Sequence, residues 1–94
     1  MTIAEALVFA AGAFDSDSQL VIVFGGFGMT SNQDLNQTWS WDGTNWVQLG
    51  PAKSPSARDG HGMAYDPGHH EVVMFGGELQ DGTPLHDTWK WTGK

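Results

Sequence analysis

The sequence predicts an all-β protein, and three observations support this fold class. Residues 20–24 and 72–75 are short apolar runs rich in Val, Ile and Phe, and each is followed by a glycine pair, which is typical of buried strands. Residues 38–41 and 88–91 read Thr-Trp-x-Trp, a period of two that places both tryptophans of each run on one face of a strand. No segment repeats apolar residues at the helical period of about 3.6 over a useful length.

The first half of the chain predicts a four-stranded meander. Strands are expected at about 7–14, 20–26, 37–41 and 45–49. The polar run Asp15 to Ser18 separates the first two strands, and Asp42-Gly43 favours a tight hairpin between the last two because both positions accept a positive φ.

The second half predicts only three strands, at 60–65, 71–77 and 87–91, with residues 66–69 as its hairpin turn. We therefore expect an unpaired edge along residues 87–92, which would invite pairing with another strand. Residues 2–6 are one candidate donor for that pairing.

The two halves repeat one pattern. Ala13-Phe14-Asp15 recurs as Ala64-Tyr65-Asp66, and Phe24-Gly25-Gly26 recurs as Phe75-Gly76-Gly77, each 51 positions later. A period near fifty is typical of propeller or solenoid arrays, whose units cannot bury their faces alone. We expect two units, residues 1–51 and 52–94, with the proline-containing segment 50–56 as the crossing between them.

Composition excludes several classes of function. The net charge is −7 with only four basic residues among 94, which argues against nucleic acid or an anionic membrane as partner. No apolar stretch approaches the roughly 20 residues of a membrane-spanning helix. The chain has no cysteine, so no disulfide is expected and the compartment stays undetermined.

These features together resemble the kelch repeat, a four-stranded blade of a β-propeller. The resemblance rests on Arg58-Asp59-Gly60-His61 before a first strand, on the glycine pairs that end each second strand, and on the tryptophans of the third and fourth strands. The first unit lacks the Arg-x-Gly-His lead. The residues that would pack between blades are Gly25, Gly26, Trp39, Trp41, Trp46, Gly76, Gly77, Trp89 and Trp91.

The resemblance implies a ring closed by self-association. Propellers close with about four to eight blades, so two-bladed chains would meet head to tail as dimers, trimers or tetramers. Because six-bladed rings are common among kelch relatives, we expect a homotrimer.

Candidate binding residues lie in the long loops. In an antiparallel meander the second-to-third and fourth-to-first connections share one end of the sheet, and long loops usually carry binding. His61 is also expected to hydrogen-bond in the channel or to a neighbouring blade. The candidates are Phe27, Met29, Asn32, Arg58, Asp59, His61, Glu78 and Leu79.

Catalytic and metal chemistry find little support. His69-His70 beside Asp66 and Glu71 fits a solvated turn better than a metal site, and no sequence feature places two carboxylates together in an apolar pocket. We expect no cofactor, no metal and no catalytic residue.

The leading functional hypothesis is therefore a non-enzymatic kelch-type unit that assembles into a ring and serves as a scaffold for protein or peptide partners. Two alternatives stay open. One is a carbohydrate-binding propeller, since tryptophan faces stack on sugar rings, and the other is a fragment of a larger kelch enzyme.

Overall fold

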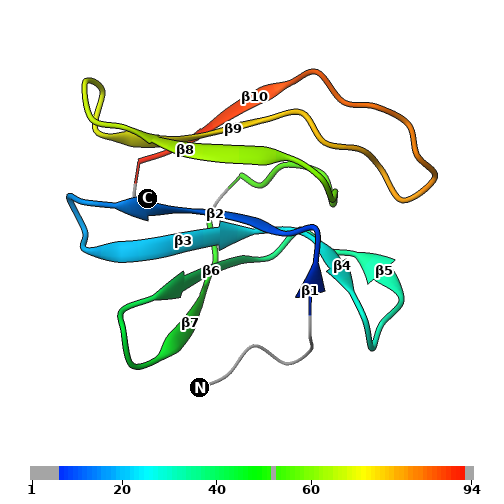
Figure 1. Cartoon of the computed structure of the whole chain (residues 1–94), viewed down its shortest axis with the longest axis horizontal. Coiled ribbons are helices and arrows are strands. Elements are labelled where there is room, and N and C mark those ends of the chain that lie inside the picture. The colour runs from blue at the N-terminus through cyan, green and yellow to red at the C-terminus, as the bar shows by residue number, and fades with distance from the viewer. Residues whose placement is uncertain (1–6, 52, 93–94) are drawn as a thin grey trace.

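The computed structural model describes residues 7–51 and 53–92, and across these residues it is all β, with ten strands in three antiparallel sheets and no helix (Figure 1). The described part accordingly contains no helix that could cross a membrane. The all-β prediction is confirmed.

The first unit forms the expected meander. Its sheet has the order β2 (Ala11–Asp15), β3 (Leu20–Phe24), β6 (Thr38–Trp41) and β7 (Trp46–Leu49), all antiparallel. Short turns join β2 to β3 and β6 to β7. A longer loop, residues 25–37, joins β3 to β6, which also pair as neighbours.

The second unit forms a sheet of three strands. These are β8 (Gly62–Asp66), β9 (Glu71–Phe75) and β10 (Thr88–Trp91), with β9 in the middle. Within the described residues β10 pairs only with β9, so its outer edge is open as predicted. The candidate donor, residues 2–6, lies outside the described residues.

Three local predictions need correction. The second strand of each unit ends at the phenylalanine before the glycine pair, because Gly25, Gly26, Gly76 and Gly77 all have φ between 69° and 95°, which an extended strand does not allow. The strand expected at 7–14 is broken by a φ of 58° at Phe9, so it becomes β1 (Leu7–Val8) and β2.

The turn at Asp42 is also longer than expected. Of its residues only Gly43 has a positive φ, and the Asp42 carboxylate accepts hydrogen bonds from the backbone N–H groups of Thr44 and Asn45, both at 2.7 Å. The loop between β6 and β7 therefore spans four residues and is stabilised by an Asx turn at Asp42.

The third sheet was not predicted. Strand β1 pairs with β4 (Phe27–Gly28), and β4 pairs with β5 (Gln33–Asp34). This small sheet gives regular structure to the first half of a segment predicted as a long loop, and it fixes the end of the molecule where binding was expected.

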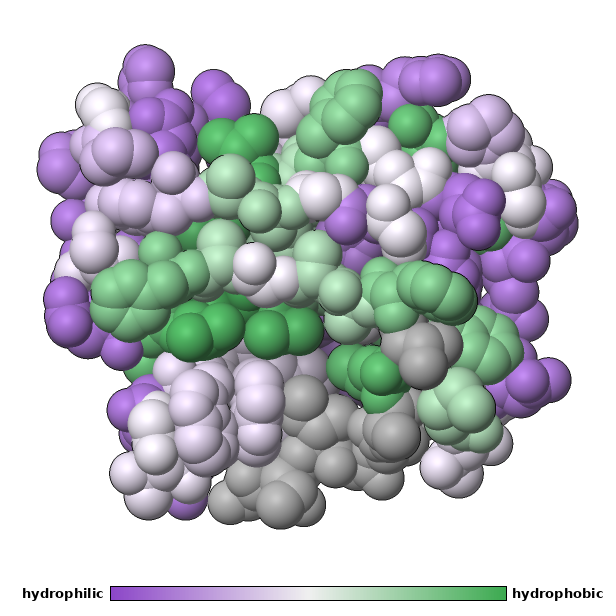
Figure 2. Space-filling model, in the orientation of Figure 1, coloured by the Kyte–Doolittle hydropathy of each residue, from purple (hydrophilic) through white to green (hydrophobic). Residues whose placement is uncertain are grey.

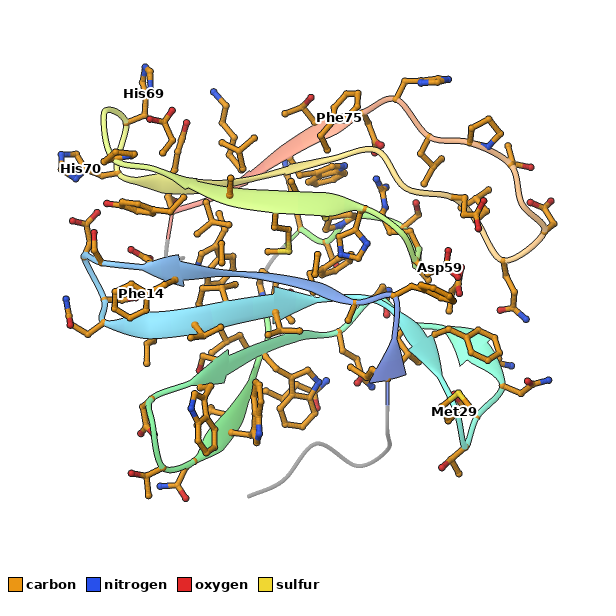
Figure 3. The ribbon with its side chains drawn as sticks, in the orientation of Figure 1. Phe14, Met29, Asp59, His69, His70 and Phe75 are labelled. Atoms are coloured by element: carbon orange, nitrogen blue, oxygen red, sulfur yellow. The ribbon has the colours of Figure 1, made fainter. Side chains whose placement is uncertain are left out.

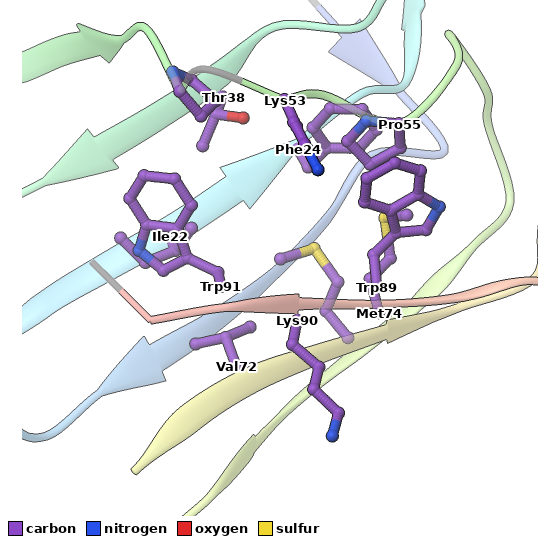
Figure 4. Close-up of a pocket in the computed structure, with 12 residues that line it drawn as sticks. Ile22, Phe24, Thr38, Lys53, Pro55, Val72, Met74, Trp89, Lys90 and Trp91 are labelled. Atoms are coloured by element: carbon purple, nitrogen blue, oxygen red, sulfur yellow. The ribbon is translucent and has the colours of Figure 1, made fainter. Parts of the chain in front are cut away.

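The core lies between the two units, and each unit has two faces. The forward face carries Ile22 and Phe24 in unit 1, and Val73 and Phe75 at the equivalent positions of unit 2; the rear face is the opposite side of each sheet. The forward face of unit 1 packs on the rear face of unit 2, which carries Val72, Met74, Trp89 and Trp91 (Figure 4).

This contact buries apolar side chains almost completely. Ile22, Phe24, Val72 and Met74 are each at most 4% exposed, and every buried methylene contributes about 0.8 kcal/mol. Strand β8 lies beside β2 (Figure 1), so the first strands of the two units are neighbours. Figure 2 shows apolar residues as a band across the middle of the viewed face, over β2 and β3.

Candidate functional site

The predicted loop-face residues gather at one end of the molecule. Figure 3 shows Met29 and Asp59 at one end, and His69 and His70 at the other. The backbone groups of Asp59 and Glu78 exchange two hydrogen bonds, of 3.1 and 2.9 Å. This pairing ties the segment that enters unit 2 to the long loop of that unit.

The loops of the two units also contact each other at this end. The Gln80 side chain accepts a hydrogen bond from the Asp34 N–H at 2.9 Å and donates one to the Asn32 carbonyl at 3.3 Å. Met29, Asn32 and Glu78 are exposed, whereas Phe27, Asp59 and Leu79 are half-buried. Six of the eight candidates thus present at least part of their surface to solvent.

Arg58 does not present its side chain to a ligand. It is 1% exposed, and all five of its N–H donors bond within the chain. Two go to the Asp87 carboxylate at 2.7 and 2.8 Å, two to Ser56, and one to the Gly76 carbonyl at 3.0 Å. The structure therefore assigns Arg58 to holding the start of β10 against the end of β9.

His61 bonds to the neighbouring unit. Its Nε2 lies 2.7 Å from the Phe24 carbonyl oxygen, and its ring packs edge-on against the Phe24 ring with centroids 5.6 Å apart. Burial is the main cause that lowers the pKa of His61, so the ring is neutral at pH 7 and Nε2 carries the donated hydrogen. His61 is 6% exposed, and its contacts with Phe24 join the two units.

The glycine pairs differ in what surrounds them. A Cβ on Gly25 would lie 2.8 Å from the Arg58 carbonyl oxygen and 2.9 Å from the His61 ring, both in unit 2. A Cβ on the equivalent Gly76 would meet only the Leu85 carbonyl oxygen, at 3.4 Å. The close approach predicted for the glycines therefore involves the next unit at Gly25, while Gly76 is restricted by its φ of 71°.

One buried carboxyl group was not predicted. Asp34 is 8% exposed, and neither of its carboxyl oxygens has a hydrogen-bond donor among the described residues. Burial is the largest cause that raises the pKa of Asp34 to about 6, followed by the carboxyls of Asp59 and Glu78. No local sequence pattern indicates this group of carboxyls, because β5 and the segment that enters unit 2 meet only in the folded chain.

A second group of possible metal ligands lies at the opposite end. Ligand atoms of Asp66, His69 and Glu71 all lie within 4.8 Å of one another. Much of this proximity has an internal cause, since His69 Nδ1 lies 2.8 Å from the Asp66 carboxylate and Lys90 Nζ lies 3.5 Å from Glu71. The sequence favours a solvated turn over a metal site here, and the two contacts engage ligand atoms of His69, Asp66 and Glu71.

The tryptophans fall into two groups. Trp89 and Trp91 lie between the units and line the pocket in Figure 4. The rings of Trp41 and Trp46 pack together on the rear face of unit 1 with centroids 5.1 Å apart, and Trp39 on the same face is 5% exposed. Trp89 and Trp91 thus meet the other unit, whereas Trp39, Trp41 and Trp46 lie on the face of unit 1 that is turned away from unit 2.

Comparison with known proteins gives a restricted result. No protein-family model matches the chain. The chain is similar to the proteins named Multiple epidermal growth factor-like domains protein 8 from Homo sapiens and from Rattus norvegicus, with 33% identity over 94 residues and 94% of this chain covered in both cases. The chain spans only 3% of the length of these relatives. The similarity therefore concerns a small part of each relative.

Proposed function

We propose that the chain is a two-bladed kelch-type propeller unit that closes into a ring with further copies of itself and acts as a non-enzymatic scaffold for protein or peptide partners. The ring proposed is a homotrimer of six blades. The observation that carries the proposal is the difference in exposure between Phe24, at 4%, and the equivalent Phe75, at 55%.

The two phenylalanines occupy the same position on equivalent strands. Phe24 lies on the forward face of unit 1, where unit 2 covers it. Phe75 lies on the forward face of unit 2, where Figure 3 shows it on the side away from unit 1. Leaving a large aromatic side chain half in water forgoes about 1–1.5 kcal/mol, half of what its complete burial would contribute. A second copy placed as unit 2 is placed on unit 1 would cover Phe75.

The opposite end of the pair offers the complementary surface. Phe14 on the rear face of unit 1 is 51% exposed, while its equivalent Tyr65 faces unit 1 and donates a 2.8 Å hydrogen bond to Asp17. The forward and rear faces differ from each other, so copies would join head to tail. A head-to-tail contact generates either a closed ring or an open fibre, and repetition of the rotation between units favours closure.

The loop end supports the scaffold part of the proposal. Backbone pairing of Asp59 with Glu78 and the bonds of Gln80 hold both long loops in one arrangement, while Met29 stays 57% exposed. A rigid frame that carries an exposed apolar side chain is the usual composition of a binding surface. Six blades would repeat this surface three times around a ring.

Native mass tests the assembly. Sedimentation equilibrium at micromolar concentration should give three times the chain mass for the wild type and the monomer mass for Phe75→Asp. Met29→Asp is the matched control because Met29 is as exposed as Phe75 and lies on the loop end, so this variant should keep the wild-type mass. A stable wild-type monomer overturns the ring, and a dimer or tetramer overturns only the number of blades.

Selection from a peptide library tests the scaffold. Peptides displayed on phage and selected against the wild type should lose binding to a variant carrying Phe27→Ser and Met29→Ser while the native mass is unchanged. Peptides that bind the variant and the wild type equally would place recognition elsewhere.

A further inference from the structure

Asp34 has a buried carboxyl group that the described part of the chain does not satisfy. Its side chain is 8% exposed, and neither of its oxygens accepts a hydrogen bond from a described donor. A buried carboxylate normally has a cation or several hydrogen-bond donors beside it, because removing it from water without them is costly. Asp34 is therefore a side chain whose burial calls for a partner.

Two further carboxyl groups lie beside Asp34. Asp59 and Glu78 are directly opposite each other in an antiparallel bridge, which places their side chains on one face of the pair, where like charges repel. The Asp34 carboxyl points at this pair, because it contacts the carboxyl of Asp59 directly. Burial first, and then Asp59 and Glu78, raise the pKa of Asp34 to about 6. Three carboxyls thus converge where the two units meet.

The backbone holds these groups together without a positive charge. Gln80 accepts a hydrogen bond from the Asp34 N–H at 2.9 Å and donates one to the Asn32 carbonyl at 3.3 Å, so it ties β5 to the long loop of unit 2. Arg58 is adjacent to Asp59 in sequence, but all five of its donors bond elsewhere. No described cation lowers the pKa of Asp34.

The group of possible ligands at the opposite end of the molecule differs in this respect. There His69 Nδ1 lies 2.8 Å from the Asp66 carboxylate, and Lys90 Nζ lies 3.5 Å from Glu71. Each of these carboxylates has a nitrogen partner within the chain, whereas Asp34 has none among the described residues. The need for an added cation therefore arises at the loop end.

We propose that Asp34, Asp59 and Glu78 form a Ca²⁺ site at the loop end, where Figure 3 shows Asp59. Carboxylate oxygens are the ligands that hard divalent cations prefer. Ca²⁺ accepts about six to eight oxygens in a flexible geometry, whereas Mg²⁺ demands a near-ideal octahedron. Carboxylates from three separate segments, with no nitrogen or sulfur donor, fit Ca²⁺ better.

The exposure of the three side chains gives the ion a way in. Glu78 is exposed and Asp59 is half-buried, while Asp34 lies beneath them. The ion enters from the Glu78 side, and water completes its coordination. Bound Ca²⁺ joins β5 of unit 1 to the entry and the long loop of unit 2. All three ligands belong to one chain, so the site does not depend on ring closure.

Calcium titration of the ¹⁵N-labelled chain tests the site. In buffer freed of divalent ions, CaCl₂ should shift the amide resonances of residues 33–35, 58–60 and 77–79, with a Kd of roughly 0.1–1 mM, as in weak Ca²⁺ modules. Asp34→Asn and Glu78→Gln should each weaken binding at least tenfold. Both replacements keep the shape of the side chain, and Glu78 is exposed, so a failure to fold is not expected to cause the loss.

Asp81→Asn is the matched control. Asp81 is exposed in the same loop, and asparagine keeps the oxygen that accepts the Thr83 N–H at 2.9 Å, so the variant removes one charge and no proposed ligand. It should weaken binding less than twofold. Equal losses in all three variants, or equal affinity for MgCl₂, would indicate diffuse attraction to an acidic chain and overturn the proposal. Shifts centred on residues 66–71, or no shift at about 10 mM CaCl₂, tenfold above the weakest binding expected, would overturn it too.

Thermal unfolding gives a second measurement. Because a ligand that binds only the folded state stabilises it, CaCl₂ should raise the Tm of the wild type and leave that of Asp34→Asn unchanged. With a chelator present, Asp34→Asn should be at least as stable as the wild type at pH 7, which shows that the variant is folded. An equal rise of Tm in both proteins would contradict the assignment of Asp34 as a ligand.

Discussion

The two units share a repeat but differ in how much of their chemistry is satisfied within one chain. Unit 1 has four strands, and its forward face is covered, with Phe24 at 4% exposure. Unit 2 has three strands among the described residues, and its forward face is open, with Phe75 at 55%. Equivalent positions of the repeat therefore differ in exposure, because the burial of a side chain depends on whether another unit packs against its face.

The units also differ at their entry. Unit 2 begins with Arg58, whose side chain is enclosed by Asp87, Gly76 and Ser56, whereas the equivalent position of unit 1 is Leu7. The positive φ that follows two residues later falls on Gly60 in unit 2 and on Phe9 in unit 1. The segment that enters unit 2 is therefore tied to β9 and β10 by a buried side chain that has no equivalent in unit 1.

The largest effect predicted here is at Gly25, and the equivalent Gly76 provides the comparison. Gly25→Ala should lower the free energy of unfolding by about 3–5 kcal/mol, because the Cβ adds a backbone collision to the cost of a positive φ. Gly76→Ala should cost only about 1–2 kcal/mol, since alanine would be strained at this φ but its Cβ would meet only the Leu85 carbonyl oxygen among the described residues, at 3.4 Å. Urea denaturation in the Phe75→Asp background measures both. Equal losses would contradict the assignment of Gly25 to a contact between units.

The next largest loss of stability is expected when Arg58 is replaced by leucine, the residue at the equivalent position of unit 1. Arg58→Leu should lower the free energy of unfolding by about 2–3 kcal/mol at pH 7, near the low end for a broken buried pair, because the partly exposed Asp87 can return to water. Urea denaturation of the variant beside the wild type checks this loss.

The same variant should alter the acid limb of stability. The Arg58 guanidinium holds the pKa of Asp87 well below its usual range, so the pair contributes stability above a pH of about 4 that is lost as the pH falls further. The Arg58→Leu variant should therefore lose less stability than the wild type below pH 4. An unchanged acid limb would show that the pair does not govern it.

The smallest effect is expected at Asp34, which has Pro84 as its unit 2 counterpart. Its pKa is raised to about 6 from 3.8, so the folded state favours the protonated carboxyl. Stability from this group is present below a pH of about 4 and is lost as the pH rises through 6. Asp34→Asn should therefore be about 1–2 kcal/mol more stable than the wild type at pH 7 and no more stable at pH 4. Thermal unfolding at the two pH values measures the difference, and an equal gain at both would contradict the ionisation argument.

Local sequence chemistry was sufficient for much of the fold. The alternation of Trp39 with Trp41, the glycine pair after Phe24 and the polar turn at Asp15 act over a few residues, and each predicted its strand or turn to within a few positions. The small sheet of β1, β4 and β5 escaped prediction because its strands are two residues long, too short for a period of two to be recognised.

The position of the candidate site was predicted from the sequence, but the role of Arg58 was not. The antiparallel alternation of connections put Met29 and Asp59 at one end, as Figure 3 shows. It could not tell that Arg58 would be enclosed, because its partner Asp87 lies 29 positions away, whereas the expected hydrogen bond of His61 to the neighbouring unit is formed with Phe24.

The sequence by itself determined the strands, the turns and the repeat, since these follow from side-chain period and backbone freedom along a short stretch of chain. Only the tertiary structure decided that Gly25 is crowded while Gly76 is open, that Asp34 lies among other carboxyls, and that Phe75 and the edge of β10 have no cover among the described residues. These properties depend on which surface faces which, and that is set by the packing of one unit on the next.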